Sequence, residues 1–191
     1  MSNGKNYKYS IWGWTFLSLF LVFLDQITKL LVVKNLDLAE YKWVINGFFS
    51  IFYVRNTGVA FSMFEKLSNG PYVLAVVAIL LACAVFYALF KISKKGYLIE
   101  CFCLSLILGG ALGNIIDRIR LKYVVDFLRF DFGPRYTFPI FNFADICAVV
   151  GCFLFIFLCI FKSKEIDEIW DMFTIKKTEA PVEKQEKNDE N

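Results

Sequence analysis

FNFADICAVVG, residues 141–151, opens an otherwise apolar segment with an asparagine and an aspartate. No charged residue follows Asp145 until position 162. A helix of about 20 apolar residues crosses the roughly 30 Å of hydrocarbon in a bilayer. The stretch therefore predicts a membrane helix at about 140–161 with Asn142 and Asp145 at one end, and the question is why polar groups stand there.

The rest of the chain has the same apolar character. Of its 191 residues 58% are hydrophobic, and the mean hydropathy is +0.54, values typical of a membrane protein rather than of a soluble domain. Three more stretches are long and nearly free of charge, at about 11–33, 71–90 and 97–116. We therefore predict an all-α membrane protein with four transmembrane helices.

The segments between these helices predict a smaller feature at the outer surface. Asn46-Gly47 lies between two strand-like runs, which is the strongest short-range signal for a β-hairpin. We expect a small extracytoplasmic β-sheet platform at about 40–60. The segment 118–139 mixes polar and apolar residues and is expected to be an interfacial loop or lid.

The last residues differ in character from the rest. We expect residues 1–162 to form one four-helix membrane domain and residues 163–191 to form a cytoplasmic helix followed by a disordered tail. The apolar residues of this helix recur with the period of a helix lying in the membrane plane: Ile166, Ile169, Trp170 and Phe173.

Four crossings place both termini on the same side of the membrane. The short loop at 91–96 carries Lys91, Lys94 and Lys95 without an acidic residue, and such loops are cytoplasmic under the positive-inside rule. We therefore expect both termini in the cytoplasm. Basic residues are also numerous on the opposite side, so a charge count alone does not fix the orientation.

The composition excludes several kinds of catalytic site. The chain has no histidine, which rules out HExxH metalloproteases and Ser-His-Asp triads, and it has no GxSxG, GxGxxG or P-loop motif. The six cysteines lie in the apolar stretches without a CxxC pair, and we expect them to be packing residues. We expect no metal, no organic cofactor and no nucleic-acid partner.

Two charged residues stand inside the first predicted helix. Asp25 and Lys29 are one helical turn apart and therefore lie on the same face. Buried charges are tolerated when they are paired, so an ion pair that fixes helix packing is the first interpretation. A proton pathway is the alternative.

The outer end of the third predicted helix is also polar. Asn114, Asp117 and Arg118 share one helix face, and the first two are expected to form a structural network. Arg118 is suited to hold a backbone carbonyl or a lipid phosphate. Glu100, at the inner end of this helix, is expected to reach water. Gly109 and Gly113 have the GxxxG spacing that lets membrane helices pack closely.

Asp126 and Asp145 are candidates for a catalytic role. Both have apolar neighbours in the sequence and are expected to be partly removed from water. If they meet, the two carboxylates share one proton, and one is then a base while the other is an acid near neutral pH. An aspartic protease activates water in this way. Separate roles as helix caps or ion-pair partners are the alternative.

Five motifs in order resemble those of the lipoprotein signal peptidase family, also called signal peptidase II. They are DQITK at 25–29, NTGVAF at 56–61, GGALGNIIDR at 109–118, VVDFL at 124–128 and FNFAD at 141–145. The resemblance covers about residues 15–160. It implies a multi-pass aspartic endopeptidase of the bacterial inner membrane, acting near the outer surface. The implied partners are membrane lipids and prolipoproteins, which are cut on the amino side of a diacylglyceryl-modified cysteine, and a monomer is expected.

The resemblance also implies roles for individual residues. Asp126 and Asp145 match the catalytic pair of the family. The residues that match substrate-seating positions are Asn56, Arg118 and Asn142. Those expected to shape the site are Asp25, Lys29, Asn114 and Asp117, together with small residues around Gly110 that would leave room for the substrate peptide.

Two other functions would need sequence features that can be checked. In a proton-coupled transporter, Asp25, Lys29, Asp117 and Asp145 would be relay groups, but the sequence shows no inverted repeat. An intramembrane protease of the presenilin kind would need a GxGD motif, which is absent.

Overall fold

The computed structural model describes residues 10–58, 70–161, 169 and 171–174. Within these residues, four helices are long and apolar enough to cross a membrane. They are α1 (Ile11–Asn35), α2 (Gly70–Ser93), α3 (Leu98–Leu121) and α4 (Phe143–Phe161). The four predicted membrane helices are thus confirmed, with α3 extending five residues beyond its expected end at 116.

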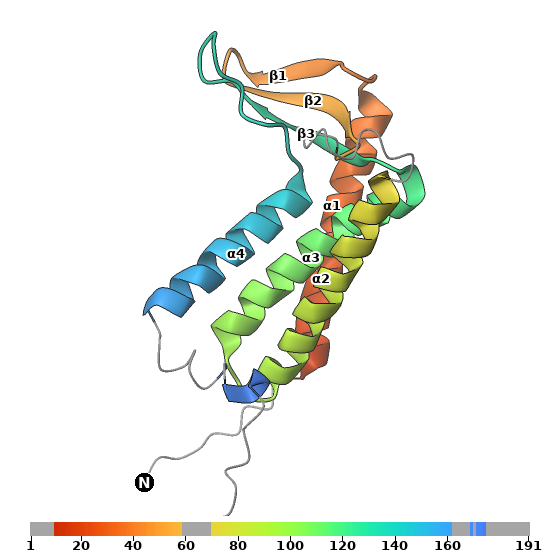
Figure 1. Cartoon of the computed structure of the whole chain (residues 1–191). Coiled ribbons are helices and arrows are strands. Elements are labelled where there is room, and N and C mark those ends of the chain that lie inside the picture. The colour runs from red at the N-terminus through yellow and green to blue at the C-terminus, as the bar shows by residue number, and fades with distance from the viewer. Residues whose placement is uncertain (1–9, 59–69, 162–168, 170, 175–191) are drawn as a thin grey trace, which may run out of the picture.

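Helix α3 lies at the centre of the bundle and packs against the other three helices (Figure 1). It is also the most buried of these four helices. The other helices expose large apolar side chains along their outer faces, for example Phe16, Leu80 and Phe153. An apolar outer surface of this extent is stable in contact with the hydrocarbon chains of a bilayer.

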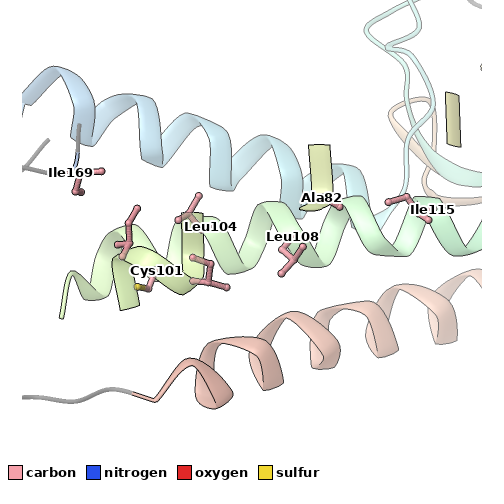
Figure 2. Close-up of a cluster of buried hydrophobic side chains, with 8 residues drawn as sticks. Ala82, Cys101, Leu104, Leu108, Ile115 and Ile169 are labelled. Atoms are coloured by element: carbon pink, nitrogen blue, oxygen red, sulfur yellow. The ribbon is translucent and has the colours of Figure 1, made fainter. Parts of the chain in front are cut away.

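An apolar core holds α2 against α3. Figure 2 shows Ala82 from α2 between Leu108 and Ile115 of α3, with Leu104 farther along α3 toward Cys101, and all are buried. Ile169, from the segment after α4, joins the same core near Cys101 and is only 6% exposed.

The predicted helix after residue 163 is described only in part. Residue 169 and residues 171–173 are helical, and Ile169 packs into the core of the bundle. The Lys91 ammonium group donates a hydrogen bond to the carbonyl of Met172 at 3.1 Å. Ile166, Trp170 and the expected disordered tail lie outside the described residues.

A three-stranded antiparallel sheet lies at the end of the bundle remote from the start of α1 and the end of α4 (Figure 1). Its strands, in spatial order, are β1 (Tyr41–Ile45), β2 (Phe49–Asn56) and β3 (Val124–Phe130). Gly47 has a φ of +72° in the turn between β1 and β2, which glycine adopts without strain. The Asn46-Gly47 hairpin prediction is therefore confirmed.

The segment 118–139 differs from the expected interfacial loop or lid. Its first residues complete α3, and residues 124–130 form β3, which pairs with β2. Even the following residues are tied to the sheet by bridges between Asp131 and Thr137 and between Leu128 and Phe141. The run VVDFLRF is rich in β-branched and aromatic residues, which explains its preference for a strand.

The glycines of α3 allow close contact, as their spacing predicted, but they do not leave room for a peptide. A Cβ atom added at Gly109 would lie 2.9 Å from the Cβ of Leu21, and one added at Gly110 would collide with the backbone oxygen of Ala144. Helices α1 and α4 already fill these spaces. The expectation of an open path around Gly110 is therefore wrong.

Glu100 also departs from expectation. Its side chain is 1% exposed, so it does not reach water, and its Oε1 has no hydrogen-bond partner among the described residues. The residue lies in the first turn of α3, where the free N–H groups of the helix stabilise negative charge.

Candidate active site

Asn142 and Asp145 form the start of α4 through two reciprocal hydrogen bonds. The backbone N–H of Asp145 donates to Oδ1 of Asn142 at 3.0 Å, and the backbone N–H of Asn142 donates to Oδ2 of Asp145 at 3.0 Å. This arrangement is a capping box, which satisfies two N–H groups that a helix start otherwise leaves unpaired. It also fixes the Asp145 carboxylate at the top of the helix and explains why α4 begins at 143 and not at 140.

The side chain of Asn142 also connects α4 to β3. Its Nδ2 donates to Oδ1 of Asp126 at 2.7 Å and to Oδ1 of Asn114 at 3.1 Å. The side chain is fully buried. Asn142 therefore contacts both aspartates, one through its backbone and one through its amide, and brings the two carboxylates to one place.

Asp126 lies on β3 and is only 2% exposed. Besides Asn142, it accepts a hydrogen bond at 2.8 Å from Nδ2 of Asn56, at the end of the neighbouring strand β2. Oδ1 of Asn56 in turn accepts from the backbone N–H of Gly58 at 2.8 Å, which turns the amide nitrogen toward Asp126. Two asparagines thus hold one buried carboxylate.

The environment of Asp126 favours its protonated form. Removal from water raises the pKa of its carboxyl to about 6, and the negative charge of Asp145 adds to this shift. The hydrogen bonds from Asn56 and Asn142 and the positive charge of Lys29 oppose it. Burial is the larger effect, so Asp126 titrates close to neutral pH.

Asp145 is less buried than Asp126 and has a different set of partners. Oδ1 accepts a hydrogen bond at 2.8 Å from Nδ2 of Asn114 on α3, while Oδ2 is held by the capping box. Its side chain is half-buried. The site thus combines one enclosed carboxyl group with one that solvent can approach.

A buried charged network lies directly behind the two aspartates. The ammonium group of Lys29 lies 2.8 Å from Oδ2 of Asp25, 2.9 Å from Oδ2 of Asp117 and 2.9 Å from Oδ1 of Asn114. The predicted ion pair of Asp25 and Lys29 is confirmed, and Asp117 extends it to a second carboxylate. All three charged side chains are at most 3% exposed.

This network supports the backbone around the site. Oδ1 of Asp25 accepts from the N–H of Ala144 at the start of α4 at 3.0 Å, and Oδ2 of Asp117 accepts from the N–H of Val125 on β3 at 3.1 Å. Each carboxylate therefore anchors the residue that precedes one of the two aspartates. The positions of Asp145 and Asp126 depend on these contacts.

Two residues differ from the sequence analysis. Gln26, which was not singled out, donates to Oδ1 of Asp117 at 3.0 Å and to the carbonyl of Gly113 at 3.2 Å. The sequence feature that could have identified Gln26 is its position directly after Asp25, as a second polar residue within an apolar helix. Among the described residues, the half-buried Arg118 makes one weak contact, 3.5 Å, to the carbonyl of Asn114 in its own helix, and none to either aspartate.

Among the residues that the structure describes, no group of three or more His, Cys, Asp or Glu side chains is placed to hold a metal ion. The fold and the site together define a multi-pass membrane protein with paired carboxylates at one end of its helix bundle. This class includes proteases that activate water with two aspartates.

Comparisons with known proteins identify the family. The model of the signal peptidase (SPase) II family matches residues 17–161, and the chain belongs to this family of membrane peptidases. The lipoprotein signal peptidase of Clostridium tetani is 44% identical over 139 residues, covering 73% of this chain and 86% of that protein. That of Enterococcus faecalis is 44% identical over 152 residues, covering 80% and 87%.

Solved structures agree with the family match. A bacterial membrane enzyme determined by the in meso method at 1.9 Å resolution superposes with a TM-score of 0.69 at 30% identity, covering 81% of this chain and 96% of that one. Membership of a peptidase family does not support the transporter interpretation.

Proposed function

We propose that this protein removes signal peptides from bacterial prolipoproteins, with Asp126 and Asp145 as the catalytic pair. The observation that carries this proposal is the double contact of Asn142, whose amide holds Asp126 while its backbone N–H holds Asp145. Signal peptidase II relatives supply the class of substrate, and the site supplies two carboxylates able to divide acid and base roles.

The two environments suggest how the roles are divided. Asp145 is the more accessible carboxylate and lies in the first turn of α4, where backbone N–H groups stabilise negative charge. It takes a proton from the attacking water. Asp126, whose pKa burial raises to about 6, carries the shared proton and gives it to the leaving amide nitrogen. The water oxygen bonds to the carbonyl carbon and the C–N bond breaks, and Asp145 then passes the proton it took to Asp126, which restores the starting state of the pair.

The position of the site in the fold bears on which side of the membrane it faces. The site lies at the sheet end of the bundle, whereas the loop that carries Lys94 and Lys95 joins α2 to α3 at the opposite end (Figure 1). This supports an active site near the outer surface, with both termini cytoplasmic. The bond on the amino side of a diacylglyceryl-modified cysteine would then lie level with the site.

The proposed substrate-seating residues divide into two kinds. The amides of Asn56 and Asn142 both donate to Asp126, so they act on the substrate mainly by holding that carboxyl in place. Arg118 is half-buried at the outer end of α3, and its guanidinium is proposed to bind a backbone carbonyl of the substrate or a lipid phosphate. The protein is proposed to act as a monomer and without a cofactor.

The test is a cleavage assay with purified protein in detergent. A diacylglyceryl-modified prolipoprotein and the unmodified precursor are incubated with wild type, Asp126→Asn, Asp145→Asn and the control Asp37→Asn, and release of the signal peptide is followed by gel mobility. Asp37 is exposed and has no hydrogen bond or ion pair with either aspartate of the pair among the described residues, so its variant should cleave normally. We expect cleavage of the lipidated substrate only, lost in both site variants. Near-normal turnover by either one would overturn the assignment.

A further inference from the structure

We propose that Lys29 is a positioning residue for the catalytic pair, because its ammonium group holds the Asn114 amide in the orientation that donates a hydrogen bond to Asp145. This inference rests on the proposed function, since it assigns Lys29 an effect on Asp145 during the reaction. It goes beyond an ion pair that stabilises helix packing.

The orientation of the Asn114 amide follows from its partners. A lysine ammonium group can only donate hydrogen bonds, so the atom of Asn114 that faces Lys29 at 2.9 Å must be the oxygen. The same oxygen accepts from the amide of Asn142 at 3.1 Å. The amide nitrogen of Asn114 is then left to donate to Asp145, at 2.8 Å. Lys29 thereby determines that Asp145 receives a hydrogen bond from the Asn114 amide nitrogen, and it does so through Asn114 and not by direct contact.

Loss of the ammonium group would reverse this preference. Asp25 and Asp117 both lie within 2.9 Å of the Lys29 nitrogen, so two buried carboxylates face the position that it occupies. Without the cation their carboxylates compete with Asp145 as acceptors for the Asn114 amide nitrogen. The amide would turn toward them and present its oxygen to Asp145, and the carboxylate would lose a donor and gain a repulsive neighbour.

The charge of Lys29 also acts on the partner aspartate. The ionisable groups around the Asn114 amide come from every element packed there: Asp25 and Lys29 from α1, Asp117 and Arg118 from α3, Asp126 from β3 and Asp145 from α4. Within this set, the positive charge of Lys29 lowers the pKa of Asp126. Its removal should therefore move the pH–rate profile to higher pH.

A small cavity gives separate access to the Lys29 position. It has a volume of about 160 Å³ and is lined by Gln26, Lys29, Asp117, Arg120 and Tyr123 among others, and neither aspartate of the pair contributes to it. Truncation of Lys29 to alanine would extend this cavity to the Asn114 amide. A small ammonium ion could then take the place of the missing group without entering the catalytic site.

The experiment is chemical rescue of Lys29→Ala. We expect kcat to fall about 100-fold, the scale of losing an electrostatic contact to a catalytic group, with little change in KM and with the limb of the pH–rate profile that reports Asp126 moved to higher pH. n-Propylammonium, the portion of the side chain that the substitution removes, should restore activity at least about tenfold in a saturable manner. 1-Propanol, which lacks the charge, and tetramethylammonium, which lacks N–H donors, should not.

Two further variants keep the test decisive. Arg120→Ala removes another cation from the wall of the same cavity and should retain wild-type kcat. Asn114→Ala leaves the ion pairs of Lys29 in place but removes the donor to Asp145, so it should lose kcat to the same extent, and the double variant should be no worse than either single one. Thermal unfolding checks that each variant is folded.

The outcomes separate this inference from the proposed function. If folded Lys29→Ala keeps a near-normal kcat, or is not rescued by n-propylammonium, the positioning role is overturned even when both aspartate variants are inactive. If Lys29→Ala does not fold, Asn114→Ala decides, because near-normal kcat in that variant also overturns the role. Activity in the aspartate variants would instead reject the catalytic pair itself.

Discussion

The end of the helix bundle beside the sheet (the sheet end) and the middle of the bundle are held together by different interactions. At the sheet end, the side chains of Lys29, Asn114 and Asn142 each contact two or more polar groups from other elements. In the middle, α1 packs closely against α3 at Gly109. A buried hydrogen bond also joins the two helices there, in which the hydroxyl of Ser18 donates to the carbonyl of Ser105 at 3.1 Å.

The difference follows from the cost of polar groups in hydrocarbon. A polar group there must find its partner within the protein, so a cluster of charges is stable only as a complete network. The sheet end concentrates that cost around the proposed catalytic pair, while the middle is built from small and apolar residues that pack closely. Substitutions at the sheet end should therefore affect activity, and those in the middle should affect stability alone.

The largest effect is expected for the pH dependence of stability at Asp126. Its pKa is raised from 3.8 to about 6 in the folded protein, so the folded state binds the proton more tightly than the unfolded state. The resulting stabilisation is complete below pH 3.8 and is lost as the pH rises through about 6, by up to about 3 kcal/mol. Thermal unfolding in detergent from pH 4 to 8 should show this decline relative to Asp126→Asn. Parallel curves for the two proteins would mean that Asp126 is not buried as described.

A second prediction separates the two roles of Asn142. Serine is as good a helix N-cap as asparagine, so Asn142→Ser should preserve the start of α4 and leave the melting temperature nearly unchanged. It removes the amide donor to Asp126 and should lower kcat about 100-fold. Asn142→Ala should lose the same activity and about 1 kcal/mol of stability in addition. A serine variant that is as active as wild type would show that the amide contact is not needed.

A third prediction concerns the contact between α3 and α4. A methyl group at Gly110 would collide with the backbone of Ala144, so Gly110→Ala should force the helices apart and lower the free energy of unfolding by about 2 kcal/mol. Gly13→Ala is the matched control, because nothing lies within 4 Å of a Cβ at that position. Equal melting temperatures for the two variants would contradict the close contact.

The smallest effect is expected in the middle of the bundle. Ser18→Ala removes the hydrogen bond to Ser105 and should cost about 0.6 kcal/mol, the average for such contacts between membrane helices. Its cleavage rate, measured on the same lipidated substrate, should equal that of wild type. A clear loss of activity would show that the middle of the bundle influences the site after all.

Local sequence signals predicted most of the architecture because they depend on short-range chemistry. Apolar length predicted the four membrane helices, and Asn46-Gly47 predicted the hairpin, since each depends only on nearby residues. The same approach missed β3, because the partner of that strand is β2, about 70 residues earlier in the chain. It also placed Glu100 in water, although burial depends on what covers a residue and not on its neighbours in the sequence.

For the candidate site, the sequence by itself determined which polar residues enter the membrane and, by resemblance, the peptidase family to which the chain belongs. Only the tertiary structure decided how those residues meet. Asn142 lies between Asp126 and Asp145, and Lys29 faces two carboxylates and Asn114, because three helices and a strand converge at one end of the bundle. Such convergence depends on contacts between distant parts of the chain, and hydrogen-bond directions are fixed only when all the partners are in place.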